Sequence, residues 1–489
     1  MNDLKQKNVM LVYFYDQFWR DVAIRLKSEG ARISCIVTDN KPFFQSAFKD
    51  AQIIDEKELE RPERITKLDN SVSLSEKLLK DLSYDENVFL SITDRLSFFP
   101  VSVHTRKKVF KELVSYWLYI LQDQNIDVII FPRMPHMGAE NVLFSVAKKL
   151  KIKTIYIERT LISDRVLLIE EEIEKTKVIA QALSETKTLD EIDPGLYKDV
   201  FAESEWLNRS KTINNAVIAK KNKQISSIIS ANKGLFSRIG RLFKSAESSQ
   251  FFFNRLYPNW YVFIIVFFYN FKCRELRRFY ENNCVAPELQ KKFVFFPLHF
   301  QVERTTLPAG GVFEDQLLAL DILSKSLPKG WVIYVKEHPR EFQYWDLRKE
   351  HFREIDDYKK MLSYENVILV SIKTDSELLA QKAQVTATIT GSIGWENLIK
   401  ARPVLVFGYP WYLPCQSCYK VGSVDECREA ISAIGFINYD KVRRDVLSFV
   451  TEYRNKMIIS SNDYQYAKKS TRPYDSLVES MAQELKSRF

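Results

Sequence analysis

Residue types that bind phosphate groups stand together at 336–340 (KEHPR), which supplies Lys336, His338 and Arg340. The preceding residues 331–335 (WVIYV) are β-branched and aromatic, which predicts a buried strand. The strand should end here, because the proline of the segment cannot donate to a sheet ladder and disfavours a helical residue before it. Since ligands of open α/β sheets bind at the carboxyl ends of strands, this segment is a candidate cationic corner for an anion.

A second candidate anion site follows the run 386–390 (TATIT), which is rich in β-branched residues and which we also expect to be a strand. The run opens into 391–400 (GSIGWENLIK), where Gly391, Ser392 and Gly394 are small enough for a ligand to approach the backbone closely. The start of the helix that should follow offers N–H groups to an anion. The two strand ends together are therefore expected to form one cationic, N–H-lined place for a phosphate.

A third polar cluster, 297–306 (PLHFQVERTT), follows the predicted strand 293–296. Gln301, Arg304 and Thr305 offer an amide, a guanidinium group and a hydroxyl to an anionic ligand. The structural alternative is that Arg304 pairs with a surface carboxylate. Three polar clusters at successive strand ends are harder to explain by such pairs than one cluster would be.

The N-terminal half places acid and base groups at strand ends as well. His136 and Glu140 follow the predicted strand 126–131, and Glu158 follows the predicted strand 153–157. We take these three side chains as candidate catalytic residues, because an acceptor hydroxyl needs a base to remove its proton. The alternative for a histidine in such a loop is a purely structural role.

The composition narrows the classes of ligand. The chain has 489 residues and a net charge of +9, from 72 Lys and Arg against 63 Asp and Glu. This mild excess of positive charge is weaker than the footprint of a nucleic-acid binder, so we expect no nucleic-acid partner. Neither a Walker-type phosphate loop nor an HExxH motif is present, and the pair Cys415 and Cys418 has no second pair to complete a zinc site. We therefore expect no metal and no other cofactor.

One region suggests contact with a lipid surface. Residues 234–244 predict a basic amphipathic helix, and the aromatic run 260–269 is followed by a cluster of Lys and Arg. Within 234–280 this pattern suits the inner face of the cytoplasmic membrane; the alternative is a helix buried between two domains. No apolar run reaches the roughly 18 residues that span a bilayer. The N-terminus lacks the apolar core of a signal peptide, so we expect a cytoplasmic protein.

The motifs at the strand ends occur in the order of a known family. Segments 296–311, 334–340, 388–396 and 403–412 together resemble bacterial capsule and surface-polysaccharide biosynthesis proteins over roughly 292–430. The resemblance implies the architecture of GT-B glycosyltransferases, which is α/β with two Rossmann-like, doubly wound parallel-sheet domains facing a cleft. Dense charge with few glycines and prolines in the middle of the chain separately predicts a helical insertion between the two domains.

The expected domain boundaries follow from this architecture and from the rhythm of strands and helices. Residues 1–185 should form an N-terminal Rossmann-like domain on the acceptor side, and 186–290 a helical, basic and aromatic insertion. Residues 291–430 should form the C-terminal Rossmann-like domain that binds the nucleotide sugar. Residues 431–489 should be helices that pack back across the domains.

The family is similar to capsule Kdo transferases and bacterial sialyltransferases, in which a His-Pro pair and a later Ser/Thr motif hold the phosphate of a CMP-sugar. On this resemblance His338 and Pro339 match the first motif, and Thr390 and Ser392 match the second. Glu396 closes the same matched segment and joins the candidate donor-binding residues.

The function that the resemblance implies is transfer of a sugar to a glycan or lipid-linked acceptor. The donor would be nucleotide-activated and CMP-linked, with Kdo or another ulosonic acid as candidate sugar. Two alternatives stay open. One is a non-catalytic factor of capsule export or assembly, and the other is an enzyme like the UDP-sugar 2-epimerases.

Overall fold

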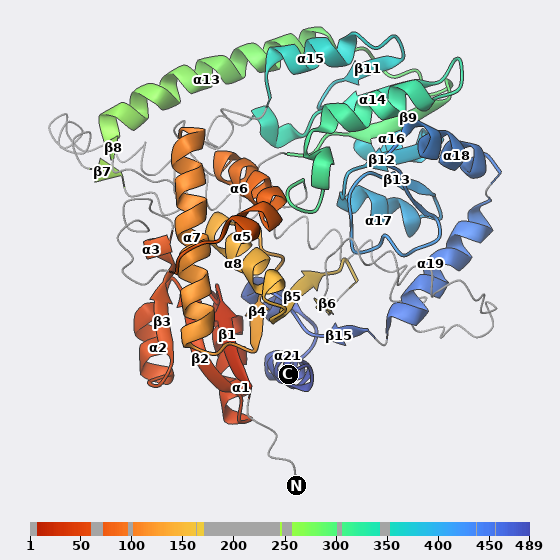
Figure 1. The fold of residues 1–489 in the computed structure, drawn as a ribbon. Helices are drawn as coiled ribbons and strands as arrows, with labels where there is room; N and C mark the ends of the chain where they lie inside the picture. The colour runs from red at the N-terminus through yellow and green to blue at the C-terminus, as the bar shows by residue number, and fades with distance from the viewer. Residues whose placement is uncertain are drawn as a thin grey trace, which may run out of the picture. The chain divides into compact units, whose positions relative to one another are not determined.

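The computed structural model of the chain (Figure 1) describes 7–59, 72–95, 101–162, 164–170, 245–246, 257–300, 306–342, 353–436, 438–454 and 456–489. These residues belong to two compact units. Unit 1 comprises Met1–Ile173, Ser248–Arg255 and Glu452–Phe489, and unit 2 comprises Glu174–Glu247 and Leu256–Thr451. Gln301, Arg304 and Thr305 lie outside the described residues, as does the predicted amphipathic helix at 234–244.

Unit 1 is built on a seven-stranded sheet in the order β15-β6-β5-β4-β1-β2-β3. The strands are β1 (Asn8–Val12), β2 (Arg32–Thr38), β3 (Gln52–Asp55), β4 (Val128–Phe131), β5 (Lys153–Arg159), β6 (Arg165–Ile169) and β15 (Met457–Ile459). The strands from β3 to β5 are parallel, β6 is antiparallel to β5, and β15 is antiparallel to β6. The order 3-2-1-4-5 is the Rossmann order, which reverses between β1 and β4.

Helices pack on this sheet because its strands are apolar on both sides, as expected for parallel strands. The helices are α1 (Gln17–Ser28), α2 (Lys41–Ala47), α3 (Glu56–Leu59), α5 (Glu76–Asp81), α6 (Ser83–Arg95), α7 (Val103–Asp123), α8 (Gly138–Lys149), α20 (Tyr464–Lys469) and α21 (Tyr474–Ser487). Helix α21 lies along α1 (Figure 1), and both share one hydrophobic core with β1. In that core Val22 and Leu26 of α1 meet Met481 and Leu485 of α21. The last helix of the chain is thereby fixed on the first.

Unit 2 is built on a six-stranded sheet in the order β11-β10-β9-β12-β13-β14. The strands are β9 (Phe293–Pro297), β10 (Val332–Lys336), β11 (Val367–Val370), β12 (Val385–Thr388), β13 (Val404–Val406) and β14 (Cys418–Lys420), and all pairs are parallel. Counted from β9 this is the Rossmann order 3-2-1-4-5-6, so the order of the strands reverses between β9 and β12. Ligands of such sheets bind outside the carboxyl ends of the strands at this switch point.

The elements around the second sheet are mostly helical. They are α13 (Asn259–Asn282), η3 (Gly311–Glu314), α14 (Gln316–Ser326), η4 (Pro339–Phe342), α15 (Ile355–Leu362), α16 (Ser376–Lys382), α17 (Ser392–Leu398), α18 (Val424–Ile434) and α19 (Tyr439–Arg454), with the short pair β7 (Ser245–Ala246) and β8 (Tyr257–Pro258). The larger core packs Val294 and Val335 of the sheet against α14 and α18. A smaller core on Phe293, Phe295 and Tyr334 meets α16.

The predicted fold class is confirmed: the chain is α/β with two Rossmann-like, mostly parallel sheets. The expected cleft between two domains stays a prediction. Strand β3, which pairs with β2, was not predicted. Strands β6, β14 and β15 were not predicted. None of the described helices is both long enough and apolar enough to cross a membrane.

Candidate functional site

The corner after β10, residues 337–340, is held by the buried carboxylate of Glu337; we call it the β10 corner. Glu337 is 1% exposed, and its Oε1 accepts the backbone N–H of His338 at 2.7 Å. Its Oε2 accepts from Nε of Arg353 at 3.0 Å and from the hydroxyl of Tyr358 at 2.8 Å. Burial opposes the charge of Arg353, but Glu337 together with Tyr358, Glu341 and Asp357 outweighs it and raises the pKa of the guanidinium group. This cluster fixes the backbone at the β10 corner.

Helix α13 is tied to the same cluster through Tyr280. The hydroxyl of Tyr280 accepts the backbone N–H of Glu337 at 2.9 Å and donates to the carbonyl oxygen of Val370 at 2.6 Å. Its ring lies 5.0 Å from that of Tyr358 and 5.4 Å from that of Phe342. The end of α13 therefore supports the β10 corner and the end of β11 together.

The imidazole of His338 is oriented by two neighbours. Its Nδ1 accepts the backbone N–H of Arg340 at 3.2 Å, which places the proton of the neutral ring on Nε2. The ring stacks on Phe300 with centroids 5.8 Å apart, and the guanidinium group of Arg340 lies 4.6 Å from the centroid of Phe300. Pro339 opens the turn η4 and is exposed. The corner therefore combines an oriented N–H donor with a cation at the carboxyl end of β10.

Lys336 does not join this corner as the sequence suggested. Its side chain is buried, and Nζ donates to the carbonyl oxygen of Thr374 at 2.5 Å and to Oγ of Ser376 at 2.6 Å. Burial lowers the pKa of Lys336. Because successive side chains of a strand point to opposite faces, Lys336 and Glu337 diverge, and Lys336 anchors the start of α16.

The bend after β12, residues 388–392, is held by a histidine that the sequence did not single out. Nε2 of His299 lies 2.9 Å from Oγ1 of Thr388 and accepts the backbone N–H of Ile389 at 3.3 Å. The backbone N–H of Gly391 donates to the same Thr388 oxygen at 3.1 Å. Burial lowers the pKa of His299 to about 4, so its ring is neutral near pH 7. The β12 bend therefore rests on a neutral imidazole.

The loop after β9 joins the two motifs across the switch point. The buried side chain of Gln316 fixes the backbone of His299, accepting its N–H at 2.7 Å and donating to its carbonyl oxygen at 3.0 Å. His299 then contacts the β12 bend, while the next residue, Phe300, contacts His338 and Arg340 of the β10 corner. The β10 corner and the β12 bend are thus joined through the consecutive residues His299 and Phe300.

The glycines of the β12 bend make room for the protein itself. A Cβ atom on Gly391 would lie 2.8 Å from Oγ1 of Thr388 and 2.9 Å from Cε1 of His299, and one on Gly394 would clash with Tyr412. The hydroxyl of Tyr412 donates to the carbonyl oxygen of Gly391 at 2.5 Å. We expected these glycines to admit a ligand, whereas their open sides are filled by packed side chains. The N–H of Gly391 is likewise used internally.

The remaining predicted residues of the bend are more open. Thr390 is half-buried, and Ser392 is exposed at the first residue of α17. Oγ of Ser392 donates to Oε1 of Glu396 at 3.2 Å. Hydroxyl and carboxylate therefore stand side by side at the carboxyl edge of β12, where a hydroxyl-bearing ligand would meet both. Within the described part of the chain, no group of His, Cys, Asp and Glu side chains could hold a metal ion.

In unit 1 the structure brings His136 and Glu140 together. Oε1 of Glu140 lies 3.3 Å from Nδ1 of His136 and accepts the backbone N–H groups of His136 at 2.8 Å and Met137 at 2.9 Å. Nδ1 of His136 also lies 3.0 Å from the carbonyl oxygen of Met134. Burial opposes the charge of Glu140, but the hydrogen bond and charge of His136, with Arg133, outweigh it and lower the pKa of Glu140. Glu140 is thus a capping carboxylate that orients a histidine.

This pair stands at the switch point of the first sheet. The loop after β4 carries His136 and also Arg133, whose guanidinium group lies 5.9 Å from the ring centroid of Tyr15, just after β1. Burial raises the pKa of Tyr15. Glu158 is 9% exposed near the end of β5, the neighbour of β4.

Comparison with known proteins agrees with the resemblance of the motifs. The family model described as capsule polysaccharide biosynthesis protein matches residues 273–414, and no curated protein matches the chain. Among solved structures, KpsC of Thermosulfurimonas dismutans, a beta Kdo 2,7 transferase, is 9% identical, with 79% of this chain and 91% of that chain covered and a TM-score of 0.29.

Two further structures are similar at the same level. MnaA of S. aureus with UDP is 10% identical, with 90% of this chain and 91% of that chain covered and a TM-score of 0.25. The UDP-GlcNAc 2-epimerase of Methanocaldococcus jannaschii, in complex with UDP-GlcNAc and UDP, is 12% identical over 91% of this chain and 99% of that chain, with a TM-score of 0.26. Because these TM-scores are low, the fold is assigned from the order of the strands in the two sheets. The match to the model of capsule polysaccharide biosynthesis proteins covers residues 273–414, which carry the β10 corner and the β12 bend.

Proposed function

We propose that the chain is a glycosyltransferase of capsular or surface polysaccharide biosynthesis that uses a nucleotide-activated sugar. The observation that carries this proposal is the pair His299 and Phe300, which joins the β10 corner to the β12 bend at the switch point of unit 2. A nucleotide is the ligand class that Rossmann-like sheets bind at this point. The match of this same unit to the capsule family supplies the biological context.

The donor phosphate would meet the β10 corner. When a sugar leaves its nucleotide, negative charge grows on the phosphate oxygens, and preorganised donors lower the barrier. Nε2–H of His338 and the guanidinium group of Arg340 supply such donors, and Pro339 fixes the turn that presents them. We extend the same role to Gln301, Arg304 and Thr305, which follow Phe300 in the sequence.

The β12 bend would bind the hydroxyl-rich part of the donor. Ser392 can donate to a phosphate oxygen, Thr390 follows the end of the strand, and the carboxylate of Glu396 can accept from a ribose or sugar hydroxyl. In this proposal Gly391 and Gly394 act indirectly, by letting His299 and Tyr412 hold the bend in place. Lys336 has no part in it, because its ammonium group donates to Ser376, the first residue of α16, and to the carbonyl oxygen of Thr374.

The base that activates the acceptor hydroxyl is proposed to be His136. Its Nδ1 lies against Glu140 and the carbonyl oxygen of Met134, so Nε2 is the nitrogen that would exchange a proton with the acceptor. The carboxylate of Glu140 would stabilise the imidazolium ion formed in the transition state. Glu158 remains the second candidate in this role.

We propose a CMP-linked ulosonic acid such as Kdo as the donor, from the match of His338–Pro339 and Thr390–Ser392 to the family motifs. A thermal-shift screen against CMP, UDP, GDP and their sugars identifies the nucleotide, since a ligand of the folded state raises the Tm. Turnover of CMP-Kdo with a glycan acceptor then tests the reaction. His338→Ala should abolish turnover while the Tm without ligand changes little, and unchanged turnover would discard the role of His338.

The same assays separate the two alternatives. Incubation with UDP-N-acetylhexosamine alone, followed by NMR, would reveal an epimerase by the appearance of a second stereoisomer. A non-catalytic factor would show glycan binding by calorimetry and no shift of Tm with any nucleotide. Either result would overturn the transferase proposal.

We further propose that α13 makes peripheral contact with an anionic membrane surface. Phe268 and Phe271 of this helix are 67% and 69% exposed, and Lys272, Arg274 and Arg278 beside them are exposed as well. Aromatic rings next to basic side chains suit the interface of an anionic bilayer. Binding to vesicles containing phosphatidylglycerol should weaken with added salt, whereas equal binding to neutral vesicles would contradict an electrostatic contact.

A further inference from the structure

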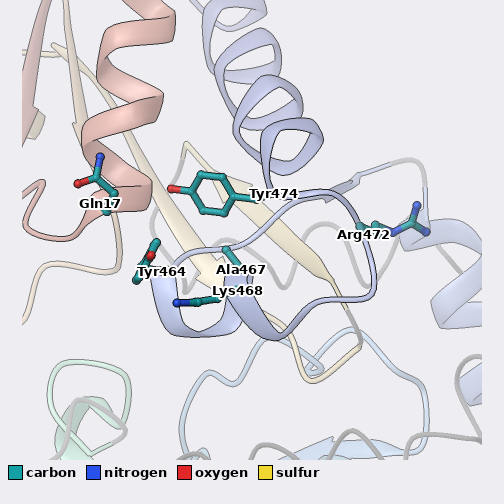
Figure 2. Close-up of a pocket in the computed structure, with 6 residues that line it drawn as sticks. All are labelled: Gln17, Tyr464, Ala467, Lys468, Arg472 and Tyr474. Carbon is teal, nitrogen blue, oxygen red and sulfur yellow. The ribbon is translucent and has the colours of Figure 1, made fainter.

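Unit 1 contains a pocket of about 340 Å³ that none of the motifs predicted (Figure 2). Its lining comes from the first turn of α1, from α20 and from the start of α21. The lining residues are Gln17, Tyr464, Ala467, Lys468, Arg472 and Tyr474. The volume lies at the lower end of the range of about 300–1,000 Å³ that is usual for small-molecule sites.

The strand directions place this pocket at the ligand-binding edge of the sheet. Gln17 follows the carboxyl end of β1 after a short loop. Tyr464 likewise follows the carboxyl end of β15, which is antiparallel to β6 and therefore runs in the same direction as β5 and β1. Both walls of the pocket thus begin at the edge of the sheet where ligands of Rossmann-like units bind.

The charge of the pocket is positive at its rim. Lys468 and Arg472 are exposed, and neither forms an ion pair with any residue in the described ranges. Nζ of Lys468 lies 5.9 Å from the ring centroid of Tyr464, and Figure 2 shows the ammonium group on the Gln17 side of the pocket. The guanidinium group of Arg472 lies at the far end and is directed away from Gln17 (Figure 2). The two cations therefore stand at opposite ends of the opening.

The carboxylate of Asp21 is bonded to two residues of the lining. Oδ1 of Asp21 accepts from Nε2 of Gln17 at 2.8 Å, and Oδ2 accepts from the hydroxyl of Tyr474 at 2.7 Å. With its amide nitrogen engaged in this way, Gln17 has its amide oxygen as the group that can accept from a ligand hydroxyl.

A second carboxylate, Asp16, links the start of α1 to the start of α20. Its oxygens accept the backbone N–H groups of Trp19 at 3.1 Å and Tyr464 at 2.9 Å. The acids thus fix the walls, and the lining itself supplies cations, aromatic rings and an amide.

The aromatic part of the lining suits a sugar ring. The rings of Tyr464 and Tyr474 meet edge to face, with centroids 5.9 Å apart. Tyrosine faces offer apolar area together with a hydroxyl, which matches the mixed surface of a saccharide. Combined with the ammonium group of Lys468, they fit a sugar that carries a negative charge.

We propose that this pocket binds an anionic saccharide, with the ring on Tyr464 and Tyr474 and its carboxylate or phosphate on Lys468. The inference rests on the proposed function for the identity of the natural ligand, which would be a charged sugar of the acceptor glycan. Binding in this pocket is independent of donor turnover, so each proposal can fail without the other.

Calorimetric titration of the full chain tests the proposal with four probes. These are a trimer of galacturonic acid, glucose 6-phosphate, the neutral maltotriose and inorganic phosphate. The galacturonate trimer or the sugar phosphate should bind, and whichever of them binds identifies carboxylate or phosphate as the recognised group. Maltotriose and inorganic phosphate should bind at least tenfold more weakly, because each lacks one half of the recognised chemistry.

Matched variants locate the binding in the pocket. Lys468→Ala should weaken binding of the charged saccharide at least fivefold, and Tyr464→Leu should do the same. Lys469→Ala removes an equal charge from the next residue of α20, which does not line the pocket, and should leave the affinity unchanged. No binding of either charged saccharide would overturn the proposal, as would an equal loss in the Lys468 and Lys469 variants. If the same protein still showed a Tm shift with a nucleotide, the proposed donor site would remain supported although the saccharide pocket was refuted.

Discussion

Nε2 of His299 lies 2.9 Å from Oγ1 of Thr388, so the loop after β9 is bonded to the end of β12 where the order of the strands reverses. The residue after His299 stacks on His338. The β10 corner and the β12 bend are therefore coupled through one short loop, and a substitution of His299 should alter the geometry of both.

The first prediction concerns pH. Burial lowers the pKa of His299 from 6.5 to about 4, so the unfolded chain binds the proton more readily than the folded chain. The contribution of the neutral ring is complete above about pH 6.5 and is lost as the pH falls towards 4. The stability difference between wild type and His299→Gln, measured by urea unfolding, should shrink over this window. A constant difference from pH 7.5 to pH 4 would contradict it.

The second prediction concerns the buried carboxylate under the β10 corner. Glu337→Gln leaves the guanidinium group of Arg353 buried without its counter-charge, which typically costs about 3–5 kcal/mol of unfolding free energy. Glu365→Gln is the matched control, because this glutamate is exposed, and its effect should stay within about 0.5 kcal/mol. A loss below about 1 kcal/mol for the Glu337 variant would show that the pair does not hold the corner.

The third prediction separates packing from ligand approach at the β12 bend. Gly394→Ala forces a Cβ atom against Tyr412 and should cost about 1–3 kcal/mol of stability without any ligand. At Gly422 a Cβ atom would meet only Glu426, at an ordinary 3.4 Å, so Gly422→Ala serves as control. Wild-type stability of the Gly394 variant, combined with lost ligand binding, would favour close approach of the ligand instead.

The fourth prediction concerns the histidine of unit 1. If His136 is the base, Glu140→Gln removes the negative charge 3.3 Å from its Nδ1, so the ring gives up its proton more easily. The acid limb of the pH profile of kcat/KM should move to lower pH, and kcat should fall because the imidazolium ion loses its partner. An unmoved acid limb would limit Glu140 to its capping role at α8.

Much of the fold could be read from local patterns. The sequence patterns placed β9, β10 and β12 within a residue or two, since these strands are buried and rich in aromatic and β-branched residues. The edge strands β3, β14 and β15 have only three or four residues and were missed, as was β6, which lies between β5 and β15. For β15 the partner lies nearly three hundred residues away, between Met457 and Leu167.

The site could be predicted in part. His338 and Ser392 were found from their place after strands, but the roles of Glu337 and His299 depend on partners far along the chain, Arg353 and Thr388. His299 lies in the polar cluster 297–306, and its position after the predicted strand 293–296 was the only feature of the sequence that pointed to a role in the site. The glycines of the bend were expected to admit a ligand, whereas the structure shows that packed side chains fill the space beside them.

The most direct test of the central claim is calorimetric titration of nucleotides into the wild-type chain, His338→Ala and Lys373→Ala. Lys373 is an exposed cation after β11 on the same edge of the sheet and controls for general charge. One of CMP, UDP and GDP should bind the wild type, and His338→Ala should weaken that binding at least tenfold, which corresponds to about 1.4 kcal/mol. Lys373→Ala should bind like the wild type. Absence of binding by all three nucleotides, or equal affinity in the His338 variant, would contradict the claim that this edge holds a nucleotide.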